Sequence, residues 1–354
     1  MGIFTRKTVV ITGGTGSLGK ILVKRLLTGK NGTPKKIIVF SRDEAKQHFM
    51  RLDYQNKDLA TDEIIYNNFQ KLLEFRIGDV RNYHSVCSVL GNANIVINAA
   101  ALKQVPSCEY FPYEAVETNI TGPENIVRAI RENNLQVDTV VGVSTDKACK
   151  PINVMGMTKA LQERIFINGN INSPKTRFIC VRYGNVLASR GSVIPLFHEQ
   201  IASGGPVTIT TADMTRFLLP LDSAVDIIIA AVKSANPGET YIPKVPSALM
   251  TNVAKALIGK RKIPIKTTGI RPGEKIHEIL VSDEEAWHTF DKGNYYAIKS
   301  MLPELNKKSK NKKMLSKEYS SKDFLMNLDE TIKFLKKYKL MIGDNTQKEG
   351  EFLR

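Results

Sequence analysis

The stretch that decides the fold is Val9-Val10-Ile11-Thr12-Gly13-Gly14-Thr15-Gly16-Ser17-Leu18-Gly19, near the start of the chain. It predicts an apolar strand, a GxxGxxG turn and the start of a helix. In such a turn the first glycine permits a tight bend, the second lets the backbone approach a pyrophosphate, and the third lets helix and strand pack closely. The helix N-terminus also attracts the anion. We therefore predict a dinucleotide site at Gly13, Thr15, Gly16, Ser17, Leu18 and Gly19; the alternative is a plain strand-to-helix turn.

Around this stretch, from Lys7 to about Arg182, short β-branched runs alternate with amphipathic segments of helical length. Such alternation is typical of a parallel sheet covered on both faces. The predicted strands are Thr8–Thr12, Lys36–Phe40, Glu74–Ile77, Asn94–Asn98, Thr139–Ser144 and Arg177–Arg182. The predicted helices are Leu18–Thr28, Thr118–Arg131, Met157–Ile167 and Leu328–Lys337, the last with Leu328, Ile332 and Leu335 on one face.

These elements predict an α/β fold, a Rossmann-type doubly wound parallel sheet with a smaller C-terminal substrate-binding lobe. After Gly184 the regular alternation stops and glycine and proline become more frequent. The predicted domains are a dinucleotide-binding domain at 1–183 and a substrate lobe at 184–300, from which some segments return to the first domain. Residues 301–354 are predicted to form a basic linker and a C-terminal helix and tail.

Composition narrows the class of protein. The 354 residues are 42% hydrophobic, and no run of about 18 apolar residues or signal peptide is present, which predicts a cytoplasmic protein without membrane insertion. Four dispersed cysteines and five unpaired histidines predict free thiols and no metal site. The net charge of +16 raises nucleic acid as a partner. Its densest run, Lys307 to Lys313, lacks interleaved aromatic residues, so we favour a solvated linker and no nucleic acid.

The end of the second predicted strand bears on the choice of cofactor. An acidic residue directly at this point would accept a ribose hydroxyl of NAD. Ser41 and Arg42 instead offer donors and a positive charge to a 2′-phosphate, which favours NADP. We assign Ser41, Arg42, Asp43 and Lys46 to this site. The alternative is that Arg42 is a surface residue and Asp43 takes the ribose.

Two motifs after the fifth predicted strand, Ser144-Thr145-Asp146-Lys147-Ala148 and Met155-Gly156-Met157-Thr158-Lys159-Ala160, resemble extended short-chain dehydrogenases. Further motifs resemble the inverting UDP-N-acetylglucosamine 4,6-dehydratases: Gly78-Asp79-Val80-Arg81, Ala101-Leu102-Lys103-Gln104-Val105-Pro106, Arg182-Tyr183-Gly184-Asn185-Val186, Arg190-Gly191-Ser192-Val193-Ile194-Pro195, Asp213-Met214-Thr215-Arg216-Phe217 and Arg271-Pro272-Gly273-Glu274-Lys275. The likeness covers residues 7 to about 280, and more loosely to 340. It is nearest to the capsule-biosynthesis 4,6-dehydratase/5-epimerases, which also have Met where the superfamily has a catalytic Tyr.

The resemblance implies roles for residues outside the glycine-rich turn. Asp79 and Val80 would line the adenine, Ala99, Ala100 and Ala101 the nicotinamide half, and Lys159 the nicotinamide ribose, with Lys103 as a further cation near cofactor and substrate. The UDP-sugar would contact Tyr183, Asn185, Arg190, Ser192, Val193, Thr208, Thr210, Arg216, Arg271 and Glu274. Of these, Asn185 and Arg216 would bind the diphosphate, and Arg271 and Glu274 phosphate and uridine ribose. Arg216 and Arg271 could instead form salt bridges at the surface or between lobes.

The implied reaction is an internal redox elimination. Hydride leaves sugar carbon 4 for NADP, a base removes the carbon 5 proton, the carbon 6 hydroxyl leaves as water, and hydride returns to carbon 6. By resemblance Lys147 is the base, Asp146 the acid, and Thr145 hydrogen-bonds the carbon 4 oxygen; Lys rather than Glu at 147 favours inversion at carbon 5. These roles need a lowered Lys147 pKa and a raised Asp146 pKa, which desolvation by the sugar would supply. The alternative is an Asp–Lys pair that only fixes the loop.

Met155 has no proton to exchange, so another group must accept the carbon 4 hydroxyl proton. We favour Lys147 as a base shared by carbons 4 and 5, with a water held by Thr145 and Lys159 as the alternative. The rival functions are a UDP-sugar 4-epimerase, which needs no elimination acid, and a non-catalytic NADP-binding sensor or scaffold. The resemblance further implies a product for surface polysaccharide or glycan synthesis and a homo-oligomer, for which it suggests a hexamer.

Overall fold

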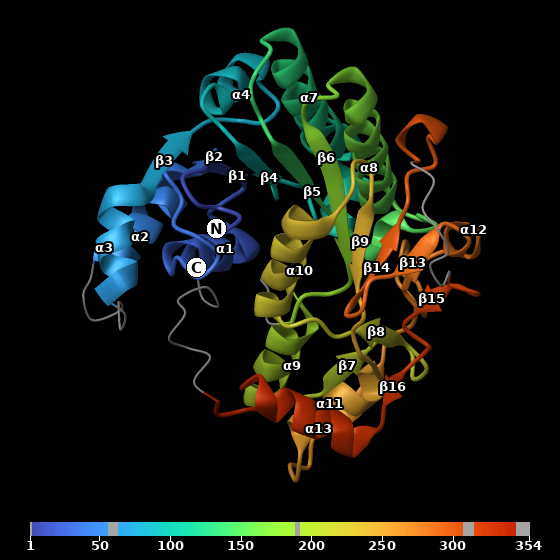
Figure 1. Ribbon diagram of the computed structural model, residues 1–354. Coiled ribbons are helices and arrows are strands. Elements are labelled where there is room, and N and C mark those ends of the chain that lie inside the picture. Colours follow the sequence, from blue (N-terminus) through green and yellow to red (C-terminus); the bar gives the residue numbers. More distant parts are fainter. Residues whose placement is uncertain (1, 56–62, 188–191, 307–314, 345–354) are drawn as a thin grey trace.

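The computed structural model describes residues 2–55, 63–187, 192–306 and 315–344 (Figure 1). Within them, the main sheet has nine strands in the order β13-β14-β9-β6-β5-β4-β1-β2-β3. The strands are β1 (Thr8–Thr12), β2 (Lys36–Ser41), β3 (Leu73–Ile77), β4 (Ile95–Asn98), β5 (Thr139–Thr145), β6 (Arg177–Tyr183), β9 (Thr240–Pro243), β13 (Thr289–Asp291) and β14 (Tyr295–Ile298). The order 3-2-1-4-5-6 of the first six strands, all parallel, confirms the predicted Rossmann-type sheet.

Helices cover both faces of this sheet, as Figure 1 shows. The alternation of β1 illustrates why, because Val9 and Ile11 enter one apolar core and Val10 the other. The first core includes residues of α1 (Ser17–Leu27), α2 (Glu44–Gln55), α3 (Glu63–Leu72) and α10 (Leu221–Ser234). The second includes residues of α4 (Tyr83–Leu90), α7 (Gly122–Glu132) and α8 (Val154–Asn172).

The six predicted strands and four predicted helices are confirmed, with differences mainly at their ends. The helix predicted at Thr118–Arg131 begins as a π-helix, η2 (Glu117–Thr121), and α8 starts three residues before its predicted start. The reason is Asn153, whose side chain accepts a hydrogen bond from Gly156 N and caps α8. The three residues predicted to share one face of the last helix differ in burial: Leu335 is buried, Ile332 packs on the core, and Leu328 is 36% exposed.

The substrate lobe consists of short elements around two apolar cores, one of which also includes residues of β9 and β14 of the main sheet. Its sheets have the orders β16-β10-β8, β11-β7 and β12-β15. These strands are β7 (Val207–Ile209), β8 (Thr215–Phe217), β10 (Ser247–Leu249), β11 (Ile265–Thr267), β12 (Ile279–Val281), β15 (Tyr319–Ser320) and β16 (Leu325–Met326), and its helices are α9 (Val193–Ala202), α11 (Met250–Ile258), α12 (Asp283–Ala286) and α13 (Leu328–Lys337). The short helix η4 (Pro303–Leu305) instead contacts α8. Since β9, β13 and β14 join the main sheet and α10 packs against it, the chain after residue 184 serves both lobes. The predicted domain boundaries stay a prediction.

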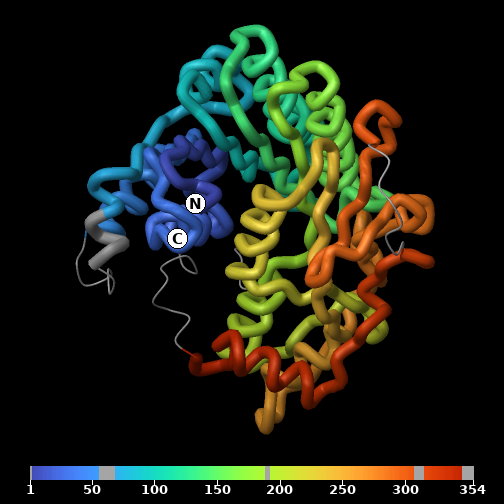
Figure 2. The backbone as a smooth tube through the Cα atoms, in the orientation of Figure 1, coloured from blue at the N-terminus to red at the C-terminus, as the bar shows by residue number. Residues whose placement is uncertain are grey.

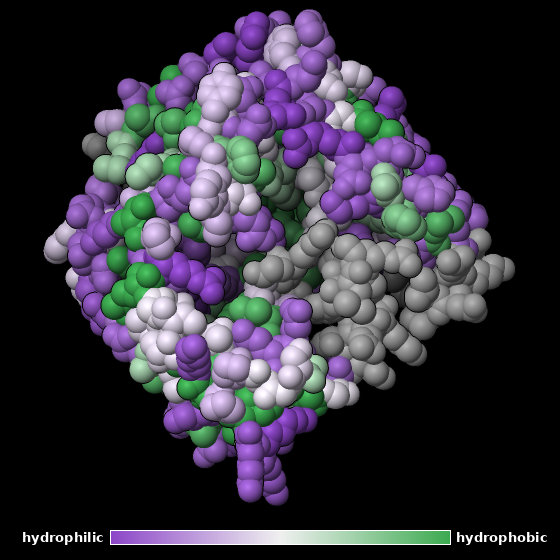
Figure 3. Space-filling model, turned by 180° about the vertical axis from the view of Figure 1, so that it is seen from behind, coloured by the Kyte–Doolittle hydropathy of each residue, from purple (hydrophilic) through white to green (hydrophobic). Residues whose placement is uncertain are grey.

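The backbone trace shows α13 running along the base of the molecule beside α11, with which it packs (Figure 2). Viewed from behind, hydrophilic side chains cover much of the surface and the face is hollowed near its middle (Figure 3). No helix within the described residues has the length and apolar character needed to cross a membrane. The four cysteines are free thiols, as predicted, and three are buried. Arg190 and the lysine run at 307–313 lie outside the described residues.

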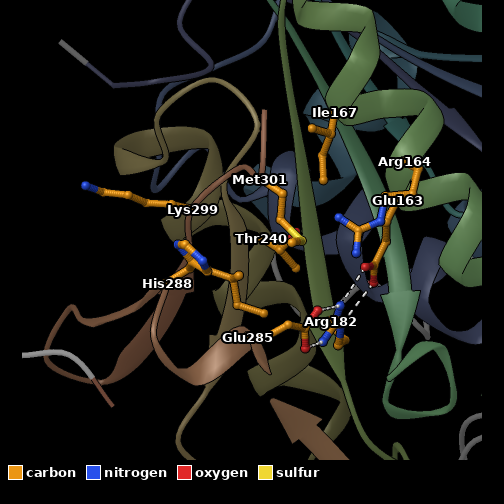
Figure 4. Close-up of a pocket in the computed structure, with 10 residues that line it drawn as sticks. Glu163, Arg164, Ile167, Arg182, Thr240, Glu285, His288, Lys299 and Met301 are labelled. Atoms are coloured by element: carbon orange, nitrogen blue, oxygen red, sulfur yellow. Dashed lines mark hydrogen bonds and ion pairs between the residues drawn. The ribbon is translucent and has the colours of Figure 1, made fainter. Parts of the chain in front are cut away.

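A buried ion network ties the main sheet to the segment around α12. Arg182, at the end of β6, lies between Glu163 of α8 and Glu285 of α12 in a small pocket (Figure 4). Its guanidinium donates to both carboxylates at 2.7–3.0 Å and to the Leu280 carbonyl at 2.9 Å. Ser144 also donates to Glu163. We call Arg182, Glu163 and Glu285 the Arg182 cluster.

Candidate active site

The glycine-rich turn fits a dinucleotide pyrophosphate. Gly13 has φ +66°, and a Cβ there would lie 2.8 Å from Ala100 Cα, so the turn packs directly on the loop after β4. A Cβ on Gly19 would overlap the Gly14 backbone, which explains the close start of α1. Gly16 caps α1 without a side-chain hydrogen bond, so no side chain competes with an anion at this helix end. The structure thus brings the predicted segments 13–19 and 99–101 together.

The end of β2 is organised by a residue that the sequence analysis did not select, Gln47. Its buried amide donates to Ser41 Oγ and to the backbone carbonyls of Ser41 and Arg76, and Thr15 Oγ1 reaches Ser41 Oγ at 3.3 Å. A polar residue one turn into the helix after β2 was the available signal.

The charged side chains here pair with one another. Arg42 lies 3.9 Å from Asp79, and the pKa of Asp79 is lowered because hydrogen bonds from Arg81 outweigh burial. Lys46 Nζ lies 2.5 Å from Asp43. Asn125 donates to the Val80 carbonyl and so holds the loop after β3. Asp43 is therefore already engaged by a lysine, while Arg42 lies at the protein surface with about half its side chain exposed.

Asp146 lies at the carboxyl end of β5, in the short helix η3 (Asp146–Ala148), and is only 1% exposed. One oxygen, Oδ1, accepts hydrogen bonds from Thr145 Oγ1 at 2.8 Å and Lys147 Nζ at 3.1 Å. The other, Oδ2, is buried without a hydrogen-bond partner in the structure. Burial raises the pKa of Asp146, and the attraction of Lys147 offsets this only in part. Asp146 therefore has the direction of shift that an acid requires.

Lys147 Nζ occupies the centre of a charged cluster. It lies 3.1 Å from Asp146 Oδ1, 3.1 Å from Glu278 Oε1 and 3.4 Å from Asn185 Oδ1. Burial alone would lower the pKa of Lys147, but the two carboxylates outweigh it and raise the pKa. The expected lowering is thus reversed in the protein without substrate. Asp146 contributes more to this rise than Glu278. Glu278 is absent from the residues selected from the sequence, although a lone acid directly before the apolar Ile279-Leu280-Val281 was a signal.

The start of α8 packs against this loop. A Cβ on Gly156 would overlap the Lys147 carbonyl, so glycine is needed for the approach. Met155 is buried in a small apolar cluster with Cys108 of α5 (Val105–Tyr110) and Ala115 of α6 (Pro112–Val116).

Lys159, one helical turn after Met155, points toward β5. Its Nζ donates to the Val143 carbonyl at 2.5 Å and to Gln162 at 2.7 Å, and burial lowers its pKa to about 8. In this arrangement its amine binds protein groups, and the ribose contact implied by resemblance stays a prediction.

The loop that carries Lys103 is fixed from the π-helix η2. Asn119 donates to the Leu102 carbonyl and to Thr158 Oγ1, and its own oxygen accepts from Leu102 N. Lys103 itself is exposed. Asn119, which none of the quoted sequence motifs contains, links the loop at Leu102 to α8 beside the predicted nicotinamide site.

The substrate-lobe residues divide into two groups. Asn185 meets Lys147, Arg216 Nε lies 3.9 Å from Glu278, Tyr183 is buried at the end of β6, and Thr210 donates to Glu274 at 3.3 Å. Among the other described residues, Thr208 is held by Gln200 of α9, Ser192 and Val193 start α9, and Arg271 is exposed. The structure thus joins Asn185 and Arg216 to the Asp146–Lys147 loop, and their contacts with a sugar nucleotide stay predictions.

Comparison with known proteins identifies the family. The model of the family described as "Polysaccharide biosynthesis protein" matches residues 9–300. The chain belongs to this family. A relative from Rickettsia bellii (strain OSU 85-389) named UDP-glucose 4-epimerase is 42% identical over 92% of this chain and 97% of its own.

Solved structures agree with this family assignment. The X-ray structure of Pen from Bacillus thuringiensis is 34% identical, with a TM-score of 0.84 over 96% of this chain and 99% of that chain. DesIV, a dTDP-glucose 4,6-dehydratase from Streptomyces venezuelae with NAD and TYD bound, shares the fold at 18% identity, with a TM-score of 0.63 over 76% and 86%. The protein is therefore an enzyme of the nucleotide-sugar epimerase/dehydratase type.

Proposed function

We propose that the protein is an NADP-dependent UDP-N-acetylglucosamine 4,6-dehydratase that inverts carbon 5. The observation that carries the proposal is the Asp146–Lys147 pair, in which a buried acid with a raised pKa and one unpartnered oxygen lies 3.1 Å from an amine. An elimination needs an acid for the departing hydroxyl and a base for the carbon 5 proton on neighbouring groups. A reaction that stops at oxidation of carbon 4 and its reversal needs no acid for a departing hydroxyl, so it gives Asp146 no role.

The proton transfers balance if Lys147 serves twice. Neutral Lys147 takes the carbon 4 hydroxyl proton and passes it to Asp146 Oδ1, 3.1 Å away. Protonated Asp146 then gives it to the carbon 6 hydroxyl, which leaves as water, while Lys147 takes the carbon 5 proton and releases it to solvent. A solvent water donates a proton to the opposite face of carbon 5. When bound, NADP would accept hydride from carbon 4 and return it to carbon 6. The net change is the loss of one water.

The second candidate is a UDP-sugar 4-epimerase, which the name of the Rickettsia relative favours. That reaction also needs a group that takes the carbon 4 hydroxyl proton. Met155 cannot do so, since it is a buried thioether in an apolar cluster. Lys147 could serve an epimerase as well, but Asp146 would then have no proton to deliver.

One experiment separates the two candidates. Purified protein is incubated with UDP-N-acetylglucosamine in deuterated water and followed by NMR, with UDP-glucose in a parallel sample. We expect a 4-keto-6-deoxy product, water loss and deuterium at carbon 5. Formation of the 4-epimer without a 6-deoxy signal would replace the proposal by the epimerase, and no turnover of either sugar with bound cofactor would favour the sensor or scaffold.

The preference for NADP is supported by the surface position of Arg42 and by the engagement of Asp43 with Lys46. A charge-assisted contact with the 2′-phosphate is worth about 1.5–3 kcal/mol. Arg42→Ala should therefore weaken NADP binding by about tenfold or more in calorimetry and leave NAD binding almost unchanged. Equal losses for both cofactors would refute this assignment.

A further inference from the structure

Glu278 is held in the active site by both of its backbone groups. Its N–H donates to Ser321 Oγ at 2.9 Å, and its carbonyl accepts from Ser321 N at 2.8 Å, next to the pairing of β12 with β15. Its position in space is thus fixed by the far C-terminal part of the chain.

The segment before Glu278 is anchored to the catalytic loop. Asn153 Nδ2, at the start of α8, donates to the Gly273 carbonyl at 2.7 Å, and Lys275 Nζ donates to the Cys149 carbonyl at 2.7 Å. Both contacts join residues 273–278 to the loop that carries Lys147. Glu278 therefore reaches Lys147 through a rigidly attached segment.

The side chain of Glu278 is buried, at 2% exposure, and only one of its oxygens is engaged. Oε1 lies 3.1 Å from Lys147 Nζ and 3.9 Å from Arg216 Nε, while Oε2 is buried with no hydrogen-bond partner in the structure. A buried carboxylate with an unpartnered oxygen costs stability, so stability alone does not explain its presence. Such groups concentrate at functional sites.

We propose that Glu278 is a positioning residue that keeps the amine of Lys147 protonated and aligned with Asp146 until substrate enters, when the amine releases this proton to solvent and becomes the neutral base. The charged groups around Lys147 come from three parts of the chain, namely Asp146, Glu278 and Arg216, with Lys275 next to Glu278. Glu278 is the carboxylate that the substrate lobe contributes, so it couples that lobe to the base. The inference rests on the proposed function only in taking Lys147 as the base.

The test measures the protonation of Lys147 without substrate. Acetic anhydride acetylates neutral amines, and mass spectrometry of peptides gives the rate at Lys147 at a fixed pH of about 8.5. Removal of a carboxylate at this distance should lower the pKa of Lys147 by about 1–2 units, so Glu278→Gln should be acetylated about 10- to 100-fold faster than wild type. Asp283→Asn, which removes an exposed charge from α12, should leave the rate unchanged.

A second pair of variants separates charge from loosened packing. Glu278→Asp keeps the charge and should label within about threefold of wild type, while Glu278→Asn should label about 10- to 100-fold faster than Glu278→Asp. Circular dichroism shows whether Glu278→Gln folds. If it does not, the comparison of Glu278→Asp with Glu278→Asn still tests the role of the Glu278 charge. Equal rates for charged and neutral variants would overturn the inference whatever reaction the wild type performs. A wild type that forms no 6-deoxy product would refute the proposed function and leave this test intact.

Discussion

Two buried charged clusters lie near the carboxyl ends of β5 and β6, and they differ in how completely their polar atoms are paired. In the Arg182 cluster, all four carboxylate oxygens of Glu163 and Glu285 accept hydrogen bonds (Figure 4). In the second cluster, formed by Asp146, Lys147 and Glu278, Asp146 Oδ2 and Glu278 Oε2 have no partner in the structure. Complete pairing is what a stabilising network requires, whereas open acceptors suit a site that must still bind something.

The largest effect should come from Lys147→Ala, and it should fall on turnover. Loss of a general base costs about 10²- to 10⁴-fold. If Lys147 is shared by carbons 4 and 5, both oxidation and elimination should disappear, as measured by cofactor absorbance and NMR of the sugar. If reduced cofactor accumulates, oxidation at carbon 4 does not need Lys147. The shared-base hypothesis is then wrong, while Lys147 can still be the base at carbon 5. If this variant exchanges the carbon 5 hydrogen with solvent at the wild-type rate, Lys147 is not the base at carbon 5 either.

The next effect concerns the Arg182 cluster and should fall on stability. Arg182→Leu leaves two buried glutamates without their cation, which typically costs about 3–5 kcal/mol in the free energy of unfolding. Denaturant titration measures this change. The control is Arg25→Leu, which removes the ion pairs of α1 with Asp222 and Asp226 of α10 near the surface and should cost below about 1 kcal/mol. Similar losses in both variants would mean that the Arg182 cluster stabilises the fold no more than an ion pair near the surface.

Acid should weaken the Arg182 cluster in a defined pH range. Burial would raise the pKa of Glu285, but Arg182 outweighs it and lowers the pKa from 4.5 to about 2. Because the folded-state pKa is depressed, the stabilisation is complete above about pH 4.5 and is lost as the pH falls toward 2. When the pH falls from 6 to 3, the free energy of unfolding of the wild type should decrease by about 2 kcal/mol more than that of Glu285→Gln, as measured by denaturant titration. If the two proteins lose equal unfolding free energy, protonation of Glu285 does not account for the loss of stability in acid.

The sequence predicted the parts of the molecule that follow from local pattern. Each of these parts is a short continuous segment whose conformation depends on nearby residues: the glycine turn at 13–19, the apolar strands, and the Asp146-Lys147 loop. Glu278 could not be paired with Lys147 in this way, because 131 residues separate them and the contact depends on the pairing of β12 with β15. The reversed pKa of Lys147 has the same origin, since it depends on a carboxylate from another lobe.

The smallest effect should follow substitution of Met155, the sharpest departure from the superfamily's Tyr. Its side chain belongs to neither charged cluster and packs with Cys108 and Ala115. Met155→Leu conserves volume and should cost below about 1.5 kcal/mol in unfolding free energy. Dehydratase turnover should stay measurable, because Asp146 and Lys147 retain their contacts with each other. Met155→Ala, which opens a cavity, should lose more stability and still turn over. If Met155→Leu folds and binds NADP but forms no product, the thioether takes part in the chemistry, and the reactive cluster extends beyond Asp146, Lys147 and Glu278.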